Sequence, residues 1–104
     1  MQTQITARHF EAKPSLKDYA SNRLSKLQRY YDGITDAHVI LTSNKTIPTD
    51  KHAEVTLRVY RQRLSAQHQG TTYEEAIDQC VNSLRRQLIR YKAKLRSKEK
   101  IVHR

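Results

Sequence analysis

The strongest constraint on the fold is one long amphipathic segment near the C-terminus. Between residues 72 and 98, apolar side chains recur at spacings of 3 and 4, which is the period of one helical face. Thr71 and Thr72 precede the segment, and Glu74 and Glu75 complement the amide dipoles of a helix N-terminus. The pattern predicts a helix over about 72–98, whose apolar stripe must be covered by another element. That stripe consists of Tyr73, Ile77, Cys80, Val81, Leu84, Leu88, Tyr91 and Leu95.

Alternating apolar and polar residues predict the strands that cover this stripe. The clearest period-two pattern runs from 53 to 59 and continues at 64–66, after a short turn near residues 61 and 62. Shorter alternating patterns at 3–7 and 37–42 predict two further strands. We therefore expect four strands, of which the last two form a hairpin.

A first helix is expected between the first two strands. Pro14 and Ser15 are typical of a helix start, and apolar residues follow at helical spacing as far as Tyr31. Gly33 then suits the left-handed position that often ends a helix. The polar stretch 43–51 predicts a loop.

The resulting element order is β-α-β-β-β-α. A helix that connects the first two strands makes that pair parallel. Each helix has one apolar stripe and each strand one apolar side, so a two-layer sandwich of the α+β class buries every apolar set in one core. Both helices then lie on one face of the four-stranded sheet. A chain of 104 residues forms a single domain, 1–104.

Positive charge is concentrated in the last fifth of the chain. Residues 85–104 hold nine basic residues and one acidic residue, whereas residues 1–84 hold eleven and nine, so net charges of +8 and +2 make up the total of +10. Such a segment repels itself and favours a polyanionic partner. Nucleic acid is the leading candidate and an anionic membrane surface the second. The alternative is that the cations only keep an amphipathic helix soluble.

The basic residues of the last helix fall on two flanks of its apolar stripe. One flank carries Arg86, Arg90 and Lys94. The other carries Arg85, Lys92 and Arg96. A shorter row on the first helix carries Arg23, Lys26 and Arg29. These ridges suit folded RNA, whose phosphates line both sides of a groove, better than base-specific recognition.

No constellation for catalysis or metal binding stands out. The five histidines lack the spacing of a zinc site, and Cys80 lies on the predicted buried stripe. Two glycines do not make a phosphate-binding loop, and no nucleophile and base are paired. We expect no enzyme activity, no metal and no cofactor. A single cysteine and the absence of a signal sequence or membrane span favour the cytoplasm.

The segment YEEAIDQCVNSLRRQLIRYKAKL, Tyr73–Leu95, resembles the signature of the ribosome hibernation promoting factor family, which includes protein Y, or ribosome-associated inhibitor A. The first helix, with Arg-Leu-Ser-Lys-Leu at 23–27 followed by Tyr-Tyr-Asp, and the Ala-Glu-Val-Thr of 53–56 are also similar to that family. The similarity spans essentially the whole chain.

The resemblance implies a fold similar to double-stranded RNA-binding domains, bound to the small ribosomal subunit and its 16S rRNA. There the protein would occupy the decoding channel, block messenger RNA and the transfer RNAs of the A and P sites, and preserve idle ribosomes. The family's basic contacts match Arg23 and Lys26 on the first helix. On the last helix they match Arg86, Arg90 and Lys94. Ser83 departs from the pattern, since relatives often have Lys there.

The chain resembles the short form of the family, without a C-terminal dimerisation domain or an acidic tail. Short members act with a second factor that pairs whole ribosomes into dimers, whereas protein Y leaves them single. Three alternatives remain from the residues themselves. They are a general structured-RNA-binding protein, an unrelated double-stranded RNA module, whose usual α-β-β-β-α order lacks the leading strand, and a nuclease, for which a proton-transfer pair is missing.

Overall fold

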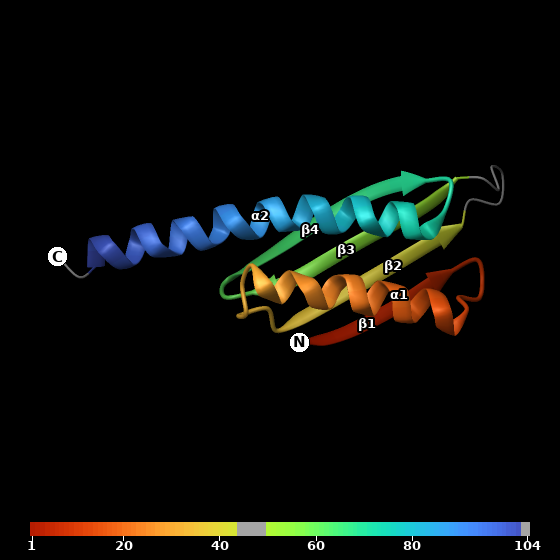
Figure 1. Ribbon diagram of the computed structural model, residues 1–104, viewed down its shortest axis with the longest axis horizontal. Coiled ribbons are helices and arrows are strands. Elements are labelled where there is room, and N and C mark those ends of the chain that lie inside the picture. The colour runs from red at the N-terminus through yellow and green to blue at the C-terminus, as the bar shows by residue number, and fades with distance from the viewer. Residues whose placement is uncertain (44–49, 103–104) are drawn as a thin grey trace.

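The computed structural model describes residues 1–43 and 50–102, with side chains as far as residue 97. Two α-helices lie on one face of a four-stranded sheet (Figure 1), so the predicted α+β class and element order are confirmed. The elements are β1 (Gln2–Arg8), α1 (Pro14–Ser25), the 3-10 helix η1 (Lys26–Arg29), β2 (Asp36–Ser43), β3 (Lys51–Val59), β4 (Gln62–Gly70) and α2 (Tyr73–Val102).

The strands lie in sequence order across the sheet. β1 and β2 are parallel, as predicted from the helix between them, and the other two pairs are antiparallel. The register places Ile5, Val39, Val55 and Ala66 side by side in one row. This row faces the helices, because Val39 and Val55 are fully buried and Ile5 packs against the same core.

One apolar core lies between the sheet and the helices. Leu41 and Leu57 from the sheet meet Leu24 of α1 and Leu84 and Leu88 of α2, and all five are fully buried. A buried leucine contributes roughly 1.5–3 kcal/mol relative to an exposed one. The predicted stripe on the last helix is therefore the face that holds α2 on the sheet.

The first helical segment differs from its prediction. The regular helix ends at Ser25, and one 3-10 turn carries the chain to Arg29. Gly33 was expected to have a left-handed backbone, but none of the described glycines has a positive φ. Its lack of a side chain is explained by a close contact instead, since a Cβ atom would lie 2.6 Å from the ring of Tyr31.

Two boundary predictions also change. Most of the predicted loop 43–51 falls on residues 44–49, which lie outside the described residues. Its ends, Ser43 and Lys51, belong to β2 and β3, where they pair with each other. The β3–β4 turn consists of Tyr60 and Arg61, one residue earlier than expected.

α2 ends at Val102, four residues later than predicted, and extends well beyond the sheet. The molecule measures 57 × 22 × 18 Å, and Figure 1 shows the C-terminal part of α2 continuing past the β3–β4 turn. Tyr91 marks the point of departure, because its hydroxyl donates a hydrogen bond of 2.5 Å to the carbonyl oxygen of Tyr60 in that turn. Between residues 92 and 97, four side chains are exposed and two are half-buried.

Candidate nucleic-acid interface

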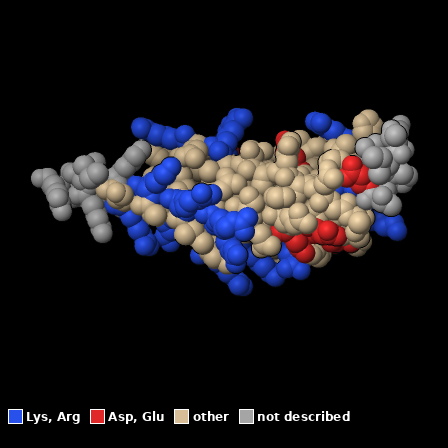
Figure 2. Space-filling model, turned by 90° about the horizontal axis from the view of Figure 1, so that it is seen from above, with Lys and Arg blue, Asp and Glu red and all other residues tan. Residues whose placement is uncertain are grey.

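Three of the four acidic residues of α2 lie in its first turns, and its basic residues lie in the later part of the helix. The backbone N–H of Glu75 donates to the hydroxyl of Thr72 at 3.1 Å, which caps the helix as the sequence predicted. Glu74, Glu75 and Asp78 follow in the first turns, and the basic residues begin at Arg85. Figure 2 shows the same separation on the surface, with Lys and Arg gathered over the projecting half of the molecule.

The two basic flanks of α2 face different neighbours. Gln87, on the side of the flank formed by Arg86, Arg90 and Lys94, donates from Nε2 to the carbonyl oxygen of Ser65 in β4 at 3.0 Å. This flank, hereafter the outer row, therefore lies on the β4 side of the helix. All three of its side chains are exposed.

The second flank lies toward the first helix. Arg85, Lys92 and Arg96 form this inner row, and Arg85 lies two turns from Asp78, which contacts α1. A hollow between η1 and α2 is lined by Arg29, Tyr30, Ile89, Lys92, Ala93 and Arg96. Arg29 of η1 and Lys92 and Arg96 of the inner row therefore line one hollow, which contains no residue of the outer row.

The cations of both rows are available to a ligand. Within residues 1–43 and 50–97, whose side chains the structure describes, none of the six lies within ion-pair distance of a carboxylate. A polyanion that binds here neutralises repelling charges without breaking an internal pair.

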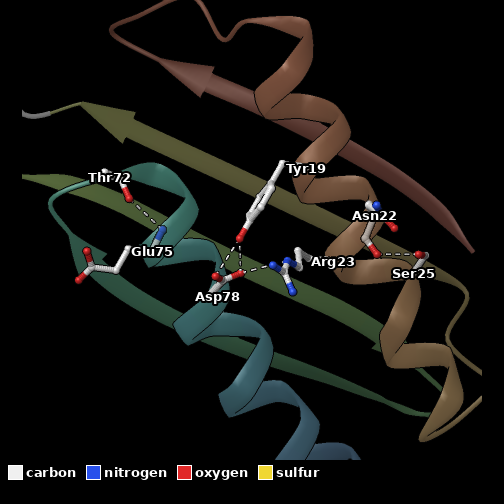
Figure 3. A network of polar contacts seen from close by, with 7 residues as sticks. All are labelled: Tyr19, Asn22, Arg23, Ser25, Thr72, Glu75 and Asp78. Atoms are coloured by element: carbon white, nitrogen blue, oxygen red, sulfur yellow. Dashed lines mark hydrogen bonds and ion pairs between the residues drawn. The ribbon is translucent and has the colours of Figure 1, made fainter.

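Arg23, predicted to contact RNA, is already paired within the protein. Its Nε lies 3.4 Å from a carboxylate oxygen of Asp78, and its guanidinium lies 4.9 Å from the centre of the Tyr19 ring. The hydroxyl of Tyr19 donates to the same carboxylate at 2.8 and 2.9 Å. Figure 3 shows Tyr19 and Arg23 of α1 directed at Asp78 of α2. The network joins the two helices and holds Arg23 in place with its side chain 42% exposed.

The network also changes the acidity of Tyr19. Partial burial is the main cause that raises the pKa of its phenol, and the hydrogen bond to the Asp78 carboxylate raises it further. Tyr19 therefore remains a hydrogen-bond donor at neutral pH. Lys26, the other predicted contact of the first helical segment, is exposed at the start of η1.

Ser83, the position expected to depart from the family pattern, is half-buried one turn before Gln87. Its hydroxyl accepts a hydrogen bond of 3.3 Å from Nε2 of Gln87. Ser83 is thus a short polar side chain that bonds within its own helix. The loss of one phosphate contact at this position stays a prediction.

Sequence reasoning missed one part of this surface and left the role of another open. The hollow beside Tyr30 brings together residues about sixty positions apart, so no local pattern reveals it. The sequence leaves open whether Tyr60 is a core or a contact residue, and the structure places it at the β3–β4 turn with 61% of its surface exposed. Among the described residues, no three His, Cys, Asp or Glu side chains are placed to share a metal ion, and no helix is long and apolar enough to cross a membrane.

The fold and the surface together define the class of this protein. It is a small α+β sandwich whose projecting basic helix is complementary to a polyanion. Comparison with known families is more specific. Residues 3–96 match the family described as Sigma 54 modulation protein / S30EA ribosomal protein, and the chain belongs to that family.

Individual relatives agree with this assignment. The chain is 31% identical over 96 residues to a ribosome hibernation promoting factor of Escherichia coli K12, covering 92% of this chain and 98% of that protein. It is 33% identical over 94 residues to the factor of the same name from Azotobacter vinelandii, covering 90% and 85%. A ribosomal subunit interface protein from Coxiella burnetii superposes with a TM-score of 0.81 at 25% identity, covering 89% of this chain and 99% of that structure.

Proposed function

We propose that this protein is a ribosome hibernation factor that binds the 16S rRNA of the small subunit in the decoding channel. It blocks messenger RNA and the A- and P-site transfer RNAs, inhibits translation, and preserves idle ribosomes in the cytoplasm. Family membership and the names of the relatives support a ribosomal role. The relatives are named as ribosome factors and not as enzymes.

The observation that carries the proposal is the unpaired cationic surface of α2. The outer and inner rows place six basic side chains on two sides of one helix, and none of them pairs with a described carboxylate. Structured nucleic acid has phosphates on both sides of its grooves, and the ribosomal names of the family and the relatives favour RNA over DNA. The projecting part of α2 reaches beyond the globular body, which suits insertion into an RNA-lined channel.

In this proposal the rows have different tasks. Arg86, Arg90 and Lys94 bind phosphates on the β4 side. Lys26 and the inner row bind on the side of α1, while Arg23 binds from a position fixed by Asp78. A second factor that promotes ribosome dimers would act on this complex.

Sedimentation tests the ribosomal role directly. A lysate of stationary-phase cells is separated on a sucrose gradient, and each fraction is probed for the full chain. Co-migration with small subunits or whole ribosomes is expected. Recovery only in the soluble top fraction contradicts the proposal, and recovery on ribosomal RNA and unrelated duplex RNA alike favours the general RNA-binding alternative.

A purified translation reaction tests the mode of action. Added protein should lower the rate of synthesis, its removal should restore the rate, and ribosomal RNA should stay full length. The variant Arg86→Ala with Arg90→Ala serves as the matched control and should inhibit only weakly. Progressive RNA fragmentation would instead identify the nuclease that the sequence left as an alternative.

A further inference from the structure

The β3–β4 hairpin violates a local rule at Arg61. Its φ is 61°, a left-handed conformation that a residue with a Cβ atom rarely adopts and that glycine adopts freely. Such strain persists where the surrounding structure enforces it, and it is concentrated at functional sites. A turn selected for stability alone would have glycine or asparagine here.

A second violation lies next to the turn. Arg58 of β3 and Arg63 of β4 are directly opposite each other in the register, where like charges destabilise a sheet. Both line a hollow on the helix-free face of the sheet, together with Glu54 and with Asp36, which is opposite Arg58 on β2. Asp36 offsets part of the repulsion. Three of the six residues 58–63 are arginine and none is acidic, so the hairpin keeps a net positive charge.

The hairpin also presents an aromatic ring to solvent. Tyr60 is 61% exposed, and the guanidinium of Arg61 lies 5.1 Å from the centre of its ring. The backbone at Tyr60 is nevertheless fixed, because its carbonyl oxygen accepts the hydrogen bond from Tyr91. The ring and the cation are thus held at the β3–β4 turn, where α2 leaves the sheet (Figure 1).

We propose that the β3–β4 hairpin is a second RNA contact, in which the Tyr60 ring stacks on an unpaired base and Arg61 binds an adjacent phosphate. Arg58 and Arg63 lie beside the turn and contribute two further cations at the same end of the sheet. The inference rests on the proposed ribosomal function. RNA fits better than a protein partner, because an exposed ring beside arginines combines stacking with neutralisation of phosphate.

The variant Arg61→Gly distinguishes a role in binding from a role in stability, because it should lower the affinity for RNA without lowering the stability of the fold. Glycine removes the cation and relieves the positive φ, so the melting temperature should stay equal or rise. Affinity for purified small ribosomal subunits should fall about tenfold or more, as for loss of one charge-assisted contact, and the salt slope should shrink by about one unit. Arg8→Gln at the opposite end of the sheet removes the same charge and should change the affinity less than about twofold.

The ring is tested by Tyr60→Ser against Tyr60→Phe. Loss of stacking should weaken binding by about fivefold or more in the serine variant, while phenylalanine should bind like the wild type. Equal affinity of wild type, Arg61→Gly and Tyr60→Ser for the subunit overturns the hairpin contact and leaves the ribosomal function standing. Failure of the wild type to bind any subunit overturns both. A loss of affinity with an unchanged salt slope in Arg61→Gly identifies a protein contact and also overturns the proposal.

Discussion

The residues of the basic surface differ in how much they contribute to the stability of the fold. Arg23 contributes to the contact between α1 and α2 through Asp78, whereas Arg86 and Arg90 are exposed and pair with no described carboxylate. Substitution of Arg23 therefore alters both the contact between the two helices and the charge of the surface. Removal of Arg86 or Arg90 changes the surface alone.

We expect stability and binding to be separable on α2. Leu88→Ala removes fully buried atoms, and a loss of roughly 2–5 kcal/mol in unfolding free energy is typical of such a cavity. Arg86→Ala with Arg90→Ala should change stability by only about 0.5 kcal/mol per site. Its affinity for small subunits should fall well over tenfold, because each charge-assisted bond contributes about 1.5–3 kcal/mol. Thermal melting measures stability, and pelleting with small subunits measures binding. If the double variant pellets as the wild type does, the outer row is an exposed surface that does not bind the ribosome.

Cys80 makes stability depend on pH in the alkaline range. Burial raises the pKa of its thiol from 9.0 to about 11. Between these values the folded protein keeps a proton that the unfolded chain releases, so the free energy of unfolding falls as pH rises. The full effect is about 3 kcal/mol. Urea unfolding at pH 8 and pH 11 should show the loss in the wild type and a smaller loss in Cys80→Ala, in which tyrosines with raised pKa still contribute. Equal losses in both proteins would contradict the assignment.

Among the elements, α2 was predictable and the end of α1 was not. The apolar stripe and the Thr72 cap of α2 are local patterns, and both are found in the structure. The role of Gly33 depends on where the ring of Tyr31 packs, and Tyr31 in turn contacts Tyr91 at 5.3 Å between ring centres. Helical periodicity likewise predicts two basic flanks on α2. Which of the two flanks lies beside α1 depends on how the two helices pack.

The cap of α2 should be measurable apart from the basic surface. Thr72→Ala removes the acceptor for the N–H of Glu75 and should cost about 0.5–2 kcal/mol of stability. Thr71→Ala is the matched control, because the Thr71 hydroxyl donates only to the exposed Glu75 side chain. The melting temperature should fall by several degrees in the first variant and less in the second. Subunit affinity should be unchanged in both, and a smaller effect at Thr72 than at Thr71 would show that the cap is not stabilising.

On the scale of the whole molecule, charge is arranged along the long axis. Acidic residues lie near the first turns of α2 and basic residues over its projecting half, as Figure 2 shows. The charge separation was predictable, because it follows from the order of residues in one helix. The positive charge that the β3–β4 hairpin adds at the same end of the molecule was not predictable, because only strand pairing places residues 58–63 beside α2. Association should therefore be oriented, with the projecting end leading.

The salt dependence of binding measures how much of the affinity this charge supplies. The two rows of α2 hold six described cations, and the segment 85–104 carries a net charge of +8. If about five to seven phosphates are neutralised, the logarithm of the association constant should fall against the logarithm of potassium concentration with a slope of roughly −4 to −6. Titration of small subunits with the full chain at several potassium concentrations gives this slope. Arg86→Ala with Arg90→Ala should reduce it by roughly two units, whereas Thr72→Ala should leave it unchanged. A flat response in the wild type would mean that shape and apolar contacts carry the affinity, with Ile89, 51% exposed between the two rows, as the first residue to test.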